Sequence, residues 1–150
     1  MPRNEAESLV AISRKIQREV HGDAVGARDR RSMARLRVLC LEVALREHPQ
    51  LRITLTDVAQ LLTLERTYCS KYFQFIVGEP FSRWIRRIRI ETAQSLLANS
   101  EMSVTEVSYA VGYDDVTTFE RNFRRQLGTN PTAFRRRVVK ELARCAAQEK

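Results

Sequence analysis

Glycine and proline are scarce in this sequence, with only 5 Gly and 4 Pro among 150 residues. Apolar residues recur at helical spacing along nearly the whole chain, and no stretch alternates apolar and polar residues over more than a few positions. This pattern excludes strand-rich and turn-rich folds and predicts an all-α protein. Hydrophobic residues make up 43% of the chain, which is enough to build a real core.

Cysteine is also rare, and its three positions, Cys40, Cys69 and Cys145, form neither a CxxC pair nor a cluster with histidine. The sequence therefore predicts no disulfide framework and no zinc site. No apolar run approaches the roughly 18 residues of a membrane-spanning helix. We expect a cytoplasmic protein with no membrane partner.

Signatures of enzymes are missing as well. The two histidines, His21 and His48, have no carboxylate or cysteine at a catalytic spacing, and there is no glycine-rich phosphate loop and no HExxH. We expect no enzymatic activity, no cofactor and no small-molecule ligand. Cys69 is expected to be a small buried residue, with a redox switch as the alternative.

Positive charge is abundant. The formal net charge is +8, and almost all the basic residues are arginine, whose planar guanidinium suits phosphates and guanine edges. This balance favours a polyanionic partner, nucleic acid ahead of a membrane surface. The alternative is a set of solvated arginines without a partner.

The first fifty residues contain two amphipathic patterns. A helix is predicted from about residue 4 to residue 20, with Leu9, Ile12, Ile16 and Val20 on one face. A break at 21–26 contains two glycines, and a second helix follows from about 30 to 47. Its predicted buried side consists of Leu36, Leu39, Cys40 and Val43.

The rest of the chain repeats itself. Residues 54–59 are echoed by 103–108, and each copy begins with Thr or Ser followed three residues later by an acid, the capping-box pattern of a helix start. Three later landmarks also match: Tyr72-Phe73 with Asn122-Phe123, Gly78 with Gly128, and Trp84 with Phe134. The offset grows by one between the two sets, which indicates one additional residue in the second turn.

Each repeat predicts a short helix, a tight turn and a longer helix, at 55–62 and 66–77 and again at about 104–111 and 116–127. This is a helix-turn-helix, whose second helix commonly enters the DNA major groove. Gly112 is expected at the second turn. A central helix (about 82–98) joins the units, and a last helix begins near Pro131. The aromatic residues predicted to lie in the core are Phe73, Trp84, Phe119, Phe123 and Phe134, and Arg135, Arg136 and Arg137 are predicted to face outward.

Residues 106–135 resemble the signature of the AraC/XylS family of regulators. They carry the acid-hydrophobe-small opening, the VGY, a D-x-T-x-F-x-R-x-F-R-R run and a closing G-x-x-P-x-x-F-R. The resemblance extends over about residues 30–138. It implies two helix-turn-helix subdomains joined by a central helix. We accordingly divide the chain into an N-terminal helix and hinge (1–27), a double helix-turn-helix DNA-binding domain (28–139) and a C-terminal tail (140–150).

The resemblance implies a bacterial transcription regulator of a short type without a sensor domain. It would bind double-stranded DNA sequence-specifically and read two successive major-groove segments, about 34 Å apart, with its two recognition helices. Activation through RNA polymerase is implied more often than repression. The alternative is a co-regulator or anti-activator that keeps the fold and acts mainly by binding another protein.

The resemblance also assigns site residues. The predicted base-contacting residues are Thr67, Ser70, Lys71, Thr117, Glu120 and Arg121. The predicted phosphate-contacting residues are Arg86, Arg87, Arg124, Arg125 and Arg135. Phosphate contact or no contact remains open for both threonines and Ser70, an ion pair with Asp114 or Asp115 remains open for Arg121, and a solvated face remains open for Arg135–Arg137.

Three features depart from the family pattern or lie outside it. Ser108 stands where a small alanine is usual, which is tolerable if its hydroxyl bonds back to the preceding turn. Pro80 lies one place early after Gly78, which leaves the start of the central helix open. The N-terminal helix is open to docking on the domain, pairing with another chain or binding another protein.

Overall fold

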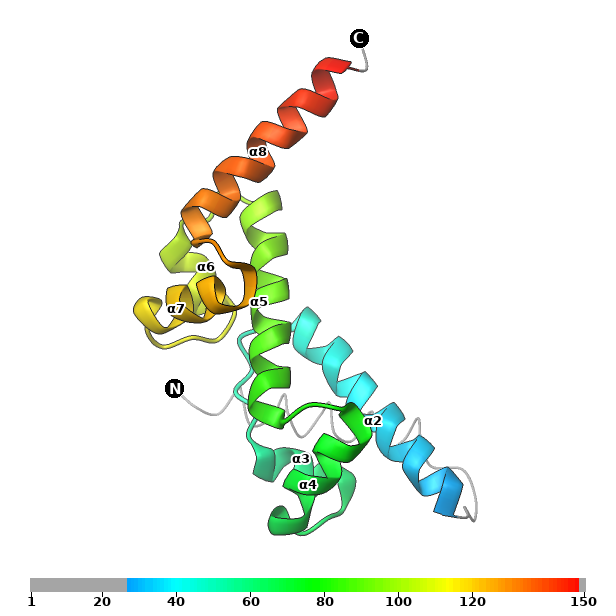
Figure 1. The fold of residues 1–150 in the computed structure, drawn as a ribbon. Coiled ribbons are helices and arrows are strands. Elements are labelled where there is room, and N and C mark those ends of the chain that lie inside the picture. The colour runs from blue at the N-terminus through cyan, green and yellow to red at the C-terminus, as the bar shows by residue number, and fades with distance from the viewer. Residues whose placement is uncertain (1–26, 149–150) are drawn as a thin grey trace. The chain divides into compact units, whose positions relative to one another are not determined.

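The computed structural model describes residues 27–148, which form seven helices and no strand (Figure 1). The helices are α2 (Ala27–Glu47), α3 (Leu55–Leu62), α4 (Arg66–Val77), α5 (Phe81–Asn99), α6 (Val104–Ala110), α7 (Val116–Leu127) and α8 (Pro131–Gln148). The predicted all-α class is confirmed. The helix predicted at about 4–20 lies outside the described residues, and the tail boundary predicted at residue 139 falls within α8.

The starts of α3 and α6 are fixed by the capping boxes that the sequence predicts. The amide of Thr54 donates to Asp57 Oδ2 at 2.7 Å, and the amide of Asp57 donates to Thr54 Oγ1 at 3.3 Å. Ser103 and Glu106 repeat the arrangement at 2.7 and 3.1 Å. Each box satisfies amides that a helix start otherwise leaves without a partner.

The described residues divide into two compact units, one ending at residue 85 and one beginning at residue 86, and the division falls within α5. In the first unit α2 packs on α3 and α4, and Phe73 meets Trp84 edge-on with 5.3 Å between ring centroids. In the second unit Phe123 meets Phe134 in the same way at 5.6 Å. The predicted correspondence of Trp84 with Phe134 is therefore confirmed by equivalent packing.

The prediction for the buried side of α2 is wrong. The residues of α2 that lie in the core are Ala34, Val38, Leu41 and Leu45. Leu36, Leu39 and Val43 are 43%, 57% and 50% exposed, and Cys40 is partly exposed. Both sets recur at spacings of three and four residues, so helical periodicity is the same for either face. Packing against α3 and α4 selects the first set.

The two turns differ by one residue, as the sequence predicts. The amide of Leu64 donates to Ala59 O at 2.8 Å, and the amide of Tyr113 donates to Ser108 O at 3.1 Å, so these positions correspond. The N-cap position of the next helix is Glu65 in the first unit and Asp115 in the second, which places the additional residue after Tyr113.

Both turns contain a left-handed residue at the same point. Gly112 has φ of 84°, as expected of glycine, but its counterpart Thr63 has φ of 57°, an unusual conformation for a β-branched residue. The capping boxes and buried helix faces on either side therefore determine this turn despite its threonine.

The displaced proline does not move the central helix. Helix α5 begins at Phe81, three residues after Gly78, just as α8 begins three residues after Gly128. The carbonyl of Pro80 accepts from the amides of Arg83 and Trp84 at 2.9 and 3.0 Å. Pro80 therefore stands just before the helix, where its missing N–H costs no hydrogen bond.

Ser108 is completely buried, and its hydroxyl has no hydrogen-bond partner among the described residues. The hydrogen bond to the preceding turn that would make this residue tolerable is not formed. The corresponding residue of the first unit is Ala59, which is also buried.

Candidate nucleic-acid interface

Helix α7 is held to its unit by one aromatic face. Phe119 and Phe123 are fully buried, with ring centroids 5.7 Å apart. They join a core cluster with Ile90, Ala93, Leu97, Val107, Val111 and Phe134. Because this face is fixed in the core, the opposite face of α7 is presented to solvent.

The start of α7 is capped by Asp115. Its carboxylate accepts from the amides of Thr117 and Thr118 at 3.2 and 2.7 Å. Hydrogen bonds from Thr118 are the main cause that lowers the pKa of Asp115 below its ordinary value, and bonds from Thr117 add to it. Asp115 thus orients the first turn of the helix that carries the predicted base contacts.

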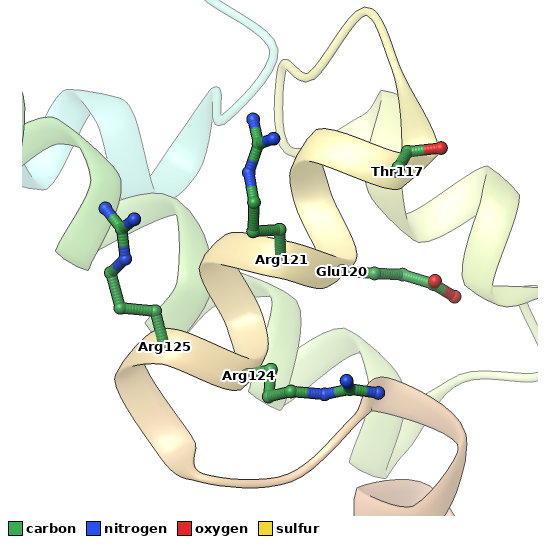
Figure 2. Close-up of a pocket in the computed structure, with 5 residues that line it drawn as sticks. All are labelled: Thr117, Glu120, Arg121, Arg124 and Arg125. Carbon is green, nitrogen blue, oxygen red and sulfur yellow. The ribbon is translucent and has the colours of Figure 1, made fainter.

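The exposed face of α7 carries all five residues predicted for the second recognition helix. They line one surface hollow of about 430 Å³: Thr117, Glu120, Arg121, Arg124 and Arg125 (Figure 2). Arg121 and Arg125 lie along one edge of this exposed face, and Thr117, Glu120 and Arg124 lie along its other edge. The structure therefore brings these five residues together on one face.

The sequence left an ion pair between Arg121 and Asp114 or Asp115 as an alternative role for this arginine. Its Nη2 instead donates to Thr118 Oγ1 at 3.5 Å, and the side chain is exposed. The carboxylate of Asp115 is engaged at the helix cap.

The first recognition helix, α4, is anchored by the buried residues Cys69, Phe73 and Ile76. The three predicted base contacts, Thr67, Ser70 and Lys71, are all exposed. Burial raises the pKa of the Cys69 thiol, which favours the protonated form and fits a core residue better than a redox switch.

An aromatic row on α4 was missed by the sequence reasoning. Tyr68 stacks on Tyr72 with 5.7 Å between ring centroids, and Tyr72 lies 6.4 Å from Phe75. Tyr68 and Phe75 are 56% and 59% exposed. The signal was present in the sequence, because residues four and three positions apart share one side of a helix.

The predicted phosphate contacts on α5 lie in polar surroundings. Arg87 pairs with Glu91 at 3.3 Å, where both side chains are about one-third exposed. Arg86 lies close enough to Tyr113 for its charge to act on that group. Burial raises the pKa of Tyr113, while the positive charges of Arg89 and Arg86 lower it.

Arg135 does not face outward, and this prediction is wrong. Its Nε donates to Leu97 O at 3.1 Å and its Nη2 donates to Met102 O. The side chain is half-buried, whereas Arg136 and Arg137 are exposed. Arg135 thus ties α8 to the end of α5 by satisfying carbonyls at and beyond that helix end.

Within residues 27–148, no three His, Cys, Asp or Glu residues are grouped so that they could hold a metal ion. No helix in this part of the chain is long and apolar enough to cross a bilayer.

Comparison with known proteins agrees with this architecture. A family model described as a helix-turn-helix domain matches residues 58–137. An AraC-type regulator from Chromobacterium violaceum has the same fold, with a TM-score of 0.58 at 19% identity over 65% of this chain and 88% of that one. The MmsAB operon regulatory protein of Pseudomonas aeruginosa is 35% identical over 98 residues, 65% of this chain and 32% of that protein. The chain belongs to the AraC/XylS family.

Two further neighbours are solved structures of single domains. The DNA-binding domain of AdpA, solved in complex with a target DNA, has a TM-score of 0.59 and 31% identity over 65% of this chain and 88% of that one. The C-terminal domain of AraT from Geobacillus stearothermophilus has a TM-score of 0.59 and 30% identity over 67% of this chain and 84% of that one.

The matched region makes up only about a third of the length of the first two relatives. The alignments cover 31% of the Msm operon regulatory protein of Streptococcus mutans and 32% of the Pseudomonas protein. The likeness therefore concerns the helix-turn-helix domain.

Proposed function

We propose that this chain is a transcription regulator that binds double-stranded DNA sequence-specifically through α4 and α7. Each helix would enter one of two successive major-groove segments. The observation that carries the proposal is the exposed face of α7, where three arginines, a glutamate and a threonine surround one hollow on a helix whose opposite face is fixed in the core.

The residue types on this face suit direct reading of bases. Arg121 and its counterpart Lys71 on α4 match the O6 and N7 acceptors of guanine, and Glu120 can accept from cytosine N4. Thr67, Ser70 and Thr117 complete the proposed base-reading set. Both sets are exposed on helices that are rigidly anchored, which is what recognition requires.

Phosphate contacts would supply affinity without sequence information. We assign them to Arg86, Arg87, Arg124 and Arg125. Arg135 was also predicted to contact phosphate; its Nε and Nη2 donate to backbone carbonyls, so only its remaining N–H groups could make such a contact.

Selection from a random-sequence duplex library tests this function. A bound motif in two parts, with centres one helical turn apart, is the expected result. Lys71→Ala should relax one part and Arg121→Ala the other, each by about 1–3 kcal/mol of discrimination. Lys140→Ala, which removes an exposed charge on α8, serves as the control and should leave the motif intact.

Transcription activation, with RNA polymerase as the partner, is part of the proposal because the curated relatives include an activator. AarP of Providencia stuartii, an HTH-type transcriptional activator, is 30% identical over 84 residues, 56% of this chain and 62% of that protein.

We place the protein in the cytoplasm, where bacterial DNA is found. A reporter carrying the selected motif upstream of a weak promoter should rise on expression of the protein, and a fall would indicate repression.

A regulator that acts mainly by binding another protein is the second candidate. The exposed apolar residues of α2, Leu36, Leu39 and Val43, favour it, because contiguous exposed apolar side chains often mark protein contacts. Failure to enrich any motif, with only weak and salt-sensitive DNA binding, would favour this candidate over the first.

A further inference from the structure

The two recognition helices can be compared position by position. Helices α4 and α7 each have 12 residues, and α7 begins fifty positions after α4. Lys71 corresponds to Arg121, Gln74 to Arg124 and Phe75 to Arg125. The face that carries three arginines on α7 therefore carries a single cation on α4.

Phe75 is an unusual residue for this position. It is large and apolar, yet 59% of it is exposed on a helix proposed to face a polyanion. A benzene ring offers no hydrogen bond to phosphate. Its exposed face can, however, bind a guanidinium, with a gain of roughly 0.5–1 kcal/mol at an open site.

A guanidinium occupies this place. The Cζ atom of Arg31, from α2, lies 4.3 Å from the centroid of the Phe75 ring. The side chain of Arg31 is itself exposed. The guanidinium lies over the face of the ring. The N–H groups of the guanidinium lie in its own plane, so they remain able to donate hydrogen bonds to an anion.

A second arginine fixes where α2 meets α4. The Nε atom of Arg35, one helical turn after Arg31, donates to Ile76 O at 3.2 Å. Ile76 belongs to the last turn of α4, where carbonyl groups have no partner within the helix. This bond holds α2 in register with α4 and so sets the position from which Arg31 reaches Phe75.

We propose that Arg31, held over Phe75, contacts a DNA phosphate beside the C-terminal half of α4. It would give the first helix-turn-helix the backbone contact that Arg125 is proposed to give the second. The cation is thus supplied by a neighbouring helix where the recognition helix itself has an aromatic ring. The inference rests on the proposed DNA-binding function, and it adds α2 to the DNA-contacting surface of the protein.

The test measures how the affinity for the selected duplex depends on salt, using the full chain. Each phosphate neutralised adds about 0.9 to the slope of log K against log salt. Arg31→Gln should lower that slope by about 0.9, so that its loss of affinity is about 3.5-fold greater at 50 mM than at 200 mM salt. The half-site motifs should not change.

Arg46→Gln is the matched control. It removes the same charge from the same helix, fifteen residues further on, which is about 22 Å along the helix axis. Its slope should equal that of the unmodified protein. Thermal unfolding of each variant, measured in parallel, reports whether Arg31 acts instead through the stability of the fold.

Two substitutions of Phe75 test the stacking. Phe75→Leu removes the ring but keeps an apolar side chain, and it should lower the salt slope as Arg31→Gln does. In the Phe75→Leu protein, adding Arg31→Gln should then reduce the affinity for DNA by less than it does in the unmodified protein. Phe75→Arg places on α4 the residue that α7 carries, and it should restore the slope of the Arg31→Gln protein.

An unchanged slope for Arg31→Gln, or a loss of affinity that follows a loss of stability at constant slope, overturns the proposal. Failure of Phe75→Arg to restore the slope overturns the equivalence with Arg125. Absence of any selected motif for the unmodified protein is a different result, since it overturns the DNA-reading function itself.

Discussion

Replacing Ser108 with alanine should stabilise the protein. The hydroxyl of Ser108 is completely buried and has no partner among the described residues. A buried polar group without a hydrogen bond costs about 1–3 kcal/mol. Alanine also has the higher helix propensity, and Ser108 lies within α6. We therefore expect Ser108→Ala to raise the free energy of unfolding by about 1–2 kcal/mol.

The first unit offers the reciprocal experiment. Ala59 occupies the corresponding position, is buried, and accepts the same kind of backbone hydrogen bond through its carbonyl. Ala59→Ser should therefore lower the free energy of unfolding by a similar amount, about 1–2 kcal/mol. One substitution removes a buried hydroxyl oxygen and the other adds one, at equivalent positions of the two units.

Urea unfolding followed by circular dichroism measures both changes, and the transition midpoint should move upward for Ser108→Ala and downward for Ala59→Ser. A constant slope of free energy against urea is needed, because a changed slope reports a different unfolded or native state. If Ser108→Ala lowers stability by 1 kcal/mol or more, the hydroxyl has a partner in solution and the reasoning fails.

Three further predictions concern other parts of the chain. Leu41→Ala should cost about 2–5 kcal/mol of unfolding free energy, because Leu41 is 4% exposed, whereas Leu39→Ala should change it by less than about 0.5 kcal/mol; equal costs in urea unfolding would contradict the assignment of the buried face. Because its pKa is lowered in the folded state, Asp115 contributes stability above its unfolded-state value of about 3.9, and this contribution is lost as pH falls through the folded value. Asp115→Asn keeps a capping side chain but cannot titrate, so its unfolding midpoint should fall less steeply below about pH 4 than that of the unmodified protein, and parallel curves would refute the role. Cys145, which is exposed, should react with a thiol reagent in the native protein at a rate far above that of buried Cys69, and rapid labelling of Cys69 without unfolding would revive the redox switch.

Local signals in the sequence were sufficient to locate the helices. The predicted bounds of α3, α4 and α7 agree with the structure at both ends. Capping boxes, a capping aspartate and left-handed glycines at the helix ends act over three or four residues, so they are visible in any short window of sequence. The repeat then related the two units to each other, because equivalent caps and aromatic residues recur at a nearly constant offset.

The exposed faces of the recognition helices also followed from the sequence. Once Cys69 and Phe73 are placed in the core of the first unit, and Phe119 and Phe123 in that of the second, helical geometry directs Lys71 and Arg121 to solvent. Which bases or phosphates these side chains contact stays a prediction, since it depends on a partner molecule.

Contacts between distant segments were beyond the sequence. Helix α2 has two apolar rows of equal periodicity, and only packing on α3 and α4 decides that Leu41 is buried while Leu39 is exposed. Arg135 reads as one of three consecutive surface arginines until the carbonyls of Leu97 and Met102, more than thirty residues away, are placed beside it. Arg31 and Phe75 are likewise joined only by the docking of two helices. The sequence determined the helices and the exposed faces of the two recognition helices, because these depend on neighbours within one or two turns. The tertiary structure decided which face of α2 is buried and which distant groups the arginines contact, because those depend on the segments that the fold brings within reach.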